Sequence, residues 1–83
     1  MRTMNVTEQR KYLDNVCALL TKEEERRMLI LDATKRIPKR GESVTLVFNR
    51  TGTLQQKYVI DRVLGILGTT ERTAYVIARL PSN

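Results

Sequence analysis

The residues of this 83-residue chain most able to do chemistry are cations, and four of them lie close together. These are Lys35, Arg36, Lys39 and Arg40. Ile37 and Pro38 separate the first two cations from the last two. Because proline is rigid, it would hold the cations in place for phosphate groups with little loss of conformational entropy on binding. The alternative is that the first two complement a helix C-terminus while the other two solvate a loop. Because the helix end explains only the first pair, we favour a phosphate-binding segment.

More cations occur in the second half of the chain, where we expect a β-sheet. They are Arg50, Lys57, Arg62, Arg72 and Arg79. Alternation along a strand sends neighbouring side chains to opposite faces, so these five need not form one patch. Tyr58 and Tyr75 lie among them and could stack on unpaired bases, as tyrosines do in sheet-based RNA binders. Tyrosines on strands are more often core residues, so sequence-specific recognition is weakly supported.

A third set of cations falls on the expected helices. It comprises Arg10, Lys11, Lys22, Arg26 and Arg27. Glu23 and Glu24 lie three or four residues before Arg26 and Arg27. Ordinary ion pairs on a solvent-exposed helix face therefore explain these two arginines. Asp14 offers the same explanation for Arg10 and Lys11.

The balance of charge points to a polyanionic partner. The net charge is +6, and ten of the fifteen basic residues are arginine. The planar guanidinium group binds phosphate oxygens through two hydrogen bonds and stacks on bases, which favours nucleic acid slightly over a general effect on solubility. Basic proteins without such a partner are also common, so charge alone leaves the question open.

Composition argues against catalysis. The chain has no histidine and one cysteine, Cys17, so zinc-finger ligands and the usual base of serine or cysteine catalysis are missing. Cys17 falls on the apolar face of a helix, where we expect a buried, inert thiol. Glu42, Asp61 and Glu71 could serve a metal-dependent nuclease, but they share no known ligand spacing and are better explained as counter-charges. We therefore expect no catalytic residue, metal or cofactor.

Two helices are expected in the first half. Asn5 and Glu8 have the spacing of a capping box, and apolar residues then recur on one face over residues 7–20. Thr21 and Glu24 repeat this spacing, which predicts a second helix from Lys22 to Ile37, ended by Pro38. One long helix is the competing interpretation.

Three strands are expected in the second half. Alternation predicts strands over 44–49, along a run that includes residues 58–67, and over 72–80. Turns are expected at 50–52 and 68–71, and Gly65 predicts a bulge or sharp bend within the long run. The predicted fold is α+β, a helical hairpin packed on a three-stranded antiparallel meander, in the order ααβββ.

The length predicts one domain over residues 1–83, and a domain this small is expected to be marginally stable. Formation of a homodimer, or binding to a partner, would add to its stability. No apolar stretch is long enough to span a membrane, and with the single cysteine this predicts a cytoplasmic protein. A winged helix-turn-helix is the main DNA-binding alternative. It needs three helices with a polar recognition helix, whereas this chain offers at most two, the second apolar.

In its basic character and lack of catalytic groups, the chain resembles small accessory proteins of bacteriophages. The resemblance implies binding of host nucleic acid, or inhibition of a host factor such as the ribonuclease toxin of a toxin-antitoxin pair. The leading hypothesis is a non-catalytic nucleic-acid binder with little sequence specificity, with RNA favoured over DNA. The rival is a protein-interaction module, an inhibitor that docks on an acidic host protein.

Overall fold

A computed structural model describes residues 4–49 and 53–81. Its elements are α1 (Val6–Ala18), α2 (Lys22–Arg26), β1 (Met28–Asp32), β2 (Ser43–Asn49), β3 (Thr53–Leu67) and β4 (Thr73–Arg79). The strands form one sheet in the order β1-β4-β3-β2, and all neighbours are antiparallel. The turn predicted at 50–52 lies outside the described residues.

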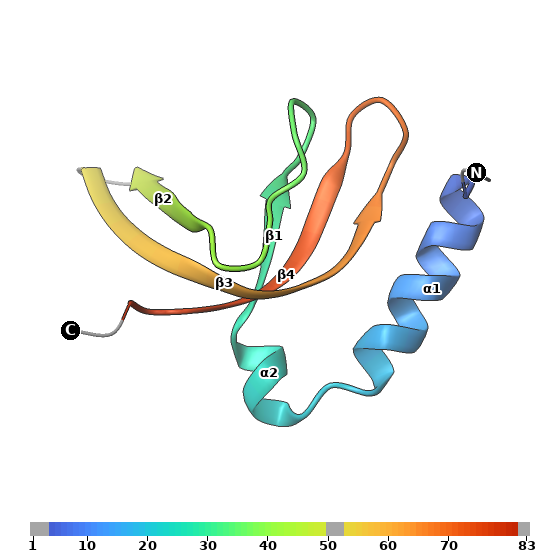
Figure 1. The fold of residues 1–83 in the computed structure, drawn as a ribbon, viewed down its shortest axis with the longest axis horizontal. Helices are drawn as coiled ribbons and strands as arrows, with labels where there is room; N and C mark the ends of the chain where they lie inside the picture. The colour runs from blue at the N-terminus through green and yellow to red at the C-terminus, as the bar shows by residue number, and fades with distance from the viewer. Residues whose placement is uncertain (1–3, 50–52, 82–83) are drawn as a thin grey trace.

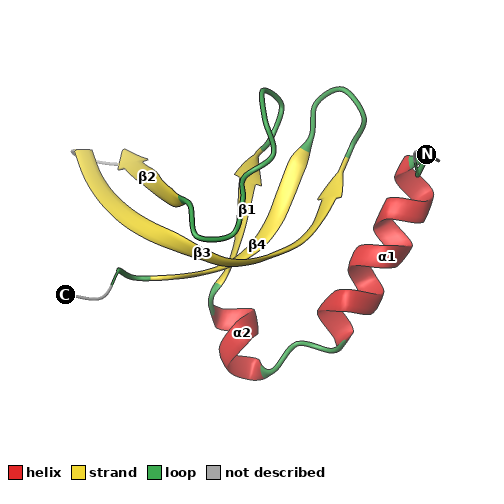
Figure 2. Ribbon diagram, viewed as in Figure 1, coloured by secondary structure: helices red, strands yellow, loops and turns green. Residues whose placement is uncertain are grey.

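The predicted ααβββ arrangement is wrong, because the segment after Arg26 is a strand. A capping box between Thr21 and Glu24 starts α2 as expected, but the helix ends after five residues. Met28–Asp32 then pairs with β4 as a fourth strand. Its apolar residues are consecutive, so they fall on both faces of the strand: Leu29 and Leu31 pack toward one apolar cluster and Met28 toward the other. That tertiary burial overrides the helical periodicity, and Pro38 lies buried in the loop of residues 33–42 (green in Figure 2).

The long strand β3 bends and takes part in two layers. Its first half pairs with β2 and its second half with β4. Register shifts between Ile60 and Arg62 and between Val63 and Gly65 mark the bend, so the bulge predicted at Gly65 is confirmed. In Figure 1 the hairpin of β2 and β3 lies at the left, β1 and β4 in the middle, and α1 at the right.

Each face of the middle layer has its own apolar cluster. Between this layer and the hairpin the buried members are Leu31, Ala33, Ile60, Ala74 and Val76. Under α1 they are Leu13, Leu64 and Ile77, with Cys17 half-buried beside them. Simple alternation would put Ile60 and Leu64 on one face, but they belong to different clusters because the irregularities in β3 change the alternation between them.

Helix α1 is held by specific contacts as well as by burial. Asn5 caps it, as predicted, by accepting a hydrogen bond from the Glu8 backbone N–H at 2.9 Å. The buried Gln9 amide clamps the turn after β3, because its oxygen accepts from the Gly68 N–H at 2.7 Å and its nitrogen donates to the Gly68 carbonyl at 3.3 Å. No helix in the described part of the chain is long and apolar enough to cross a membrane.

The contact between Leu13 and Gly65 predicts that a single methyl group will destabilise the fold. A Cβ atom at Gly65 would lie 2.6 Å from Cδ2 of Leu13, whose side chain is only 2% exposed. We expect Gly65→Ala to lower the free energy of unfolding by about 1 to 3 kcal/mol, measured by urea denaturation.

The double variant distinguishes this clash from a general effect of substitution. Leu13→Ala alone should cost about 2 to 5 kcal/mol through its cavity. With both changes, the cavity accepts the new methyl group, so the total cost should fall below the sum of the two. Strict additivity would contradict the close approach of α1 to β3.

Candidate nucleic-acid interface

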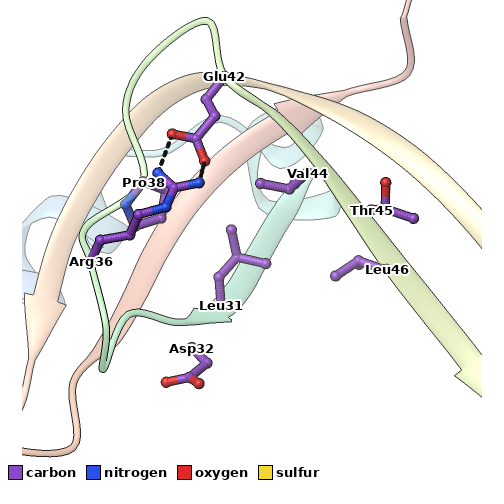
Figure 3. A pocket seen from close by; sticks show the side chains of 8 residues that line it. All are labelled: Leu31, Asp32, Arg36, Pro38, Glu42, Val44, Thr45 and Leu46. Atoms are coloured by element: carbon purple, nitrogen blue, oxygen red, sulfur yellow. Dashed lines mark hydrogen bonds and ion pairs between the residues drawn. The ribbon is translucent and has the colours of Figure 1, made fainter.

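The four-cation segment predicted to bind phosphate lies in the loop of residues 33–42, but only part of it remains available. Both terminal nitrogens of Arg36 donate to the Glu42 carboxylate, at 2.7 and 2.6 Å (Figure 3). This pair borders a cavity of 260 Å³ above Leu31, Val44 and Leu46. The other three cations of the segment are exposed and form no ion pair with a described residue.

The bond to Arg36 also fixes the charge state of Glu42. Hydrogen bonding from Arg36 is the largest influence that lowers the pKa of Glu42, and the Lys39 backbone N–H adds to it at 3.4 Å. The same bond raises the pKa of Arg36. This carboxylate therefore stays ionised and cancels one cation of the predicted cluster.

Four of the five cations predicted on the sheet are described, and they have separate environments. Arg62 lies 3.8 Å from the Glu24 carboxylate, and Arg72 donates to the Thr34 carbonyl at 3.2 Å. Lys57 is exposed on the hairpin. Arg79 binds Asp61 at 3.1 Å, and Arg50 falls outside the described residues. Arg62, Arg72 and Arg79 thus each have a different partner.

The two predicted stacking tyrosines have different environments. Tyr75 packs against the buried cluster under α1, so it serves the core. Tyr58 instead lines a cavity of 340 Å³ on the other side of the middle layer. Both are half-buried, and Tyr58 is placed in the candidate site because it lines this cavity.

Three arginines surround the cavity of Tyr58. They are Arg26 and Arg27 at the end of α2, and Arg79 at the end of β4. Leu29, Ala78 and Leu80 supply the apolar remainder of the wall. A mainly apolar cavity lined in part by arginine residues suits a ligand that combines a flat apolar ring with negative charge. We call these seven residues the arginine pocket.

Asp61 organises two of the arginines. It is left without a cross-strand partner by the register shift in β3, and its two oxygens bind Arg27 at 2.8 Å and Arg79 at 3.1 Å. The Nε atom of Arg27 is buried and has no hydrogen-bond partner among the described residues, although Glu23 lies 3.8 Å away. Arg26 forms no ion pair within the described chain. Asp61 and Glu23 thus offset part of the positive charge of the pocket.

Sequence reasoning missed Arg26 and Arg27 as site residues. Their glutamate neighbours explained them as a solvated helical face, and the 3.8 Å contact of Arg27 with Glu23 is indeed such a pair. The missing information was the strand at Met28, because a helix that ends at Arg26 turns these two side chains toward β4. A consecutive apolar run directly after two arginines was the available signal.

The carboxylates considered for a nuclease have other roles in the described structure. Glu42 binds Arg36, and Asp61 bridges Arg27 and Arg79. Glu71 lies exposed at the turn before β4. Within residues 4–49 and 53–81, no three acidic or cysteine side chains gather as metal ligands.

Comparison with known proteins adds no relative to this description. No family model, curated protein or solved structure matches the chain. The resemblance to bacteriophage accessory proteins accordingly stays a prediction.

The pair of Arg36 and Glu42 predicts part of the acid sensitivity of the fold. The pKa of Glu42 is lowered on folding, so its contribution to stability is present above the ordinary value of 4.5 and is lost as pH falls through the lowered pKa. We expect Glu42→Gln to reduce the slope of unfolding free energy against pH below that value, measured by urea denaturation across the acid range. An unchanged slope would show that the ion pair does not persist in solution.

Proposed function

We propose that the chain binds single-stranded nucleic acid, RNA in preference to DNA, without catalysing a reaction. The arginine pocket would be the centre of the site. Phosphate groups would bind Arg26, Arg27 and Arg79, and an unpaired base would lie against Tyr58. The observation that carries the proposal is that three arginine residues and Tyr58 line one cavity whose wall is mainly apolar.

The chemistry of the pocket supports a nucleotide over a simple anion. Stacking of a base on an aromatic side chain contributes about 1 to 3 kcal/mol and tolerates any base, because every base has a π-face. Arginine supplies paired hydrogen bonds to phosphate.

The exposed cations of the loop support a wider electrostatic contribution. Lys35, Lys39 and Arg40 form no ion pair among the described residues, so they would attract the polymer at long range. Such contacts carry no sequence information, which fits a binder of low specificity. Occupying host RNA in this way would be one route to inhibit an RNA-processing factor, as the bacteriophage resemblance implies.

Binding to a short oligouridine should depend on salt. The logarithm of the binding constant is expected to fall linearly with the logarithm of salt concentration, by about 0.7 per phosphate contact. Arg26→Ala should weaken binding and reduce that slope by about one contact. Arg10→Ala is the matched control, because it removes an exposed cation from α1 on the opposite side of the middle layer. Fluorescence anisotropy at several salt concentrations measures both.

Tyr58 tests the stacking contribution separately. Tyr58→Ala should weaken binding by about 5- to 150-fold, the equivalent of one lost stack, with little change in the salt slope. Tyr58→Phe keeps the ring and should bind like the original protein. Tyr75→Phe is the control at the other tyrosine. If Tyr75→Phe lost binding while Tyr58→Ala kept it, the site would not be at Tyr58.

The competing class of function gives a different result in the same assay. A protein-interaction module would bind oligouridine weakly or with no dependence on Tyr58 and Arg26. The purified protein would also lose any co-purified nucleic acid after nuclease and high-salt washing, as judged by its absorbance ratio at 260 and 280 nm. That pair of outcomes would reject nucleic-acid binding and favour docking on an acidic protein.

A further inference from the structure

Asp61 is an acidic residue in contact with two of the three arginines of the arginine pocket. Its Oδ2 atom lies 2.8 Å from a terminal nitrogen of Arg27, and its Oδ1 atom lies 3.1 Å from Nε of Arg79. The two arginines come from the end of α2 and the end of β4, which are far apart in the sequence. One carboxylate on β3 therefore joins side chains from two other elements.

The backbone of Asp61 is better fixed than the two side chains that it holds. The residues on either side of it, Ile60 and Arg62, pair with β4, and Ile60 is buried. The side chains of Arg27 and Arg79 are 34% and 47% exposed, so solvent is open to each of them. The carboxylate thus gives two long, partly exposed side chains a fixed point of attachment.

The contacts with Asp61 leave several guanidinium nitrogens without a partner in the described part of the chain. Arg79 meets the carboxylate through Nε, and its two terminal nitrogens donate no hydrogen bond to a described residue. Arg27 uses one terminal nitrogen, and the other donates to no described residue. These nitrogens are the donors that a phosphate group would bind.

We propose that Asp61 is a positioning residue that strengthens the binding of RNA, although its charge has the same sign as that of the ligand. The inference rests on the proposed function. Arginine side chains that are already ordered lose less conformational entropy when phosphate binds. Without the carboxylate, the like charges of Arg27 and Arg79 would repel each other, and both side chains would move into solvent.

An account based on charge alone predicts the reverse. A carboxylate repels phosphate, so its neutralisation would tighten binding. Asp61→Asn keeps the size of the side chain and raises the net charge by one. Asp14→Asn raises it equally and is the matched control, because Asp14 is exposed on α1 and forms no ion pair with a described residue.

Fluorescence anisotropy with oligouridine distinguishes the two accounts by the sign of the effect. Asp61→Asn should weaken binding by about 2- to 10-fold, which corresponds to the cost of ordering a freed arginine side chain. Asp14→Asn should bind as tightly as the original protein or slightly more tightly. If the original protein binds and Asp61→Asn binds as tightly or better, the role of Asp61 is rejected and the proposed function stands. If the original protein does not bind, both are rejected.

A double-mutant cycle separates positioning from a general effect on the fold. In the background of Arg79→Ala, one of the two side chains held by Asp61 is gone, so Asp61→Asn should cost less affinity than it does alone. Circular dichroism establishes that each variant is folded. An equal loss in both backgrounds would show that Asp61 does not act through Arg79 and would overturn the proposal.

NMR relaxation of the arginine Nε nuclei gives a test on the unmodified protein, which serves if Asp61→Asn does not fold. Without RNA, the side chains of Arg27 and Arg79 should be restricted, whereas Arg26, which has no ion pair within the described chain, should be mobile. Added oligouridine should restrict Arg26 and change the mobility of the other two little. Equal mobility of all three in the free protein would overturn the proposal.

Discussion

The bend in β3 is the constraint on which the rest of this structure depends. Ile60, Val63 and Ile66 face the same cluster at intervals of three residues, while their partners Ala78, Val76 and Ala74 follow at intervals of two. The two register shifts accommodate the extra residues of β3. Because of them, one strand serves both the outer hairpin and the middle layer, and a chain this short closes an apolar cluster on each face of that layer.

The same bend creates the candidate site. The first irregularity frees Asp61 from the ladder and holds it between Arg27 and Arg79. It also directs the first half of β3, with Tyr58, over the end of β4. Among the described residues the surplus charge does not form one broad face, since Arg36, Arg62 and Arg79 each have an acidic neighbour. The proposal therefore rests on a small pocket, in which three arginines and one tyrosine line the same cavity.

Local signals in the sequence predicted the elements that local interactions decide. The caps at Asn5 and Thr21, the strands after Gly41 and the irregularity at Gly65 follow from short-range hydrogen bonding and alternation. The strand at Met28 did not follow, because its apolar run fits a helix as well as a strand, and only pairing with β4, far along the chain, decides between them. Tyr58 was identified but not distinguished from Tyr75, whereas Arg26 and Arg27 were missed with that strand.

Chemical-shift mapping by NMR tests the central claim most directly. Titration of labelled protein with oligouridine should shift the resonances of the Tyr58 ring, of the guanidinium groups of Arg26, Arg27 and Arg79, and of the neighbouring Leu80. Residues on the outer side of α1, such as Arg10, should be unaffected. Shifts centred on α1, or none at saturating RNA, would contradict the account.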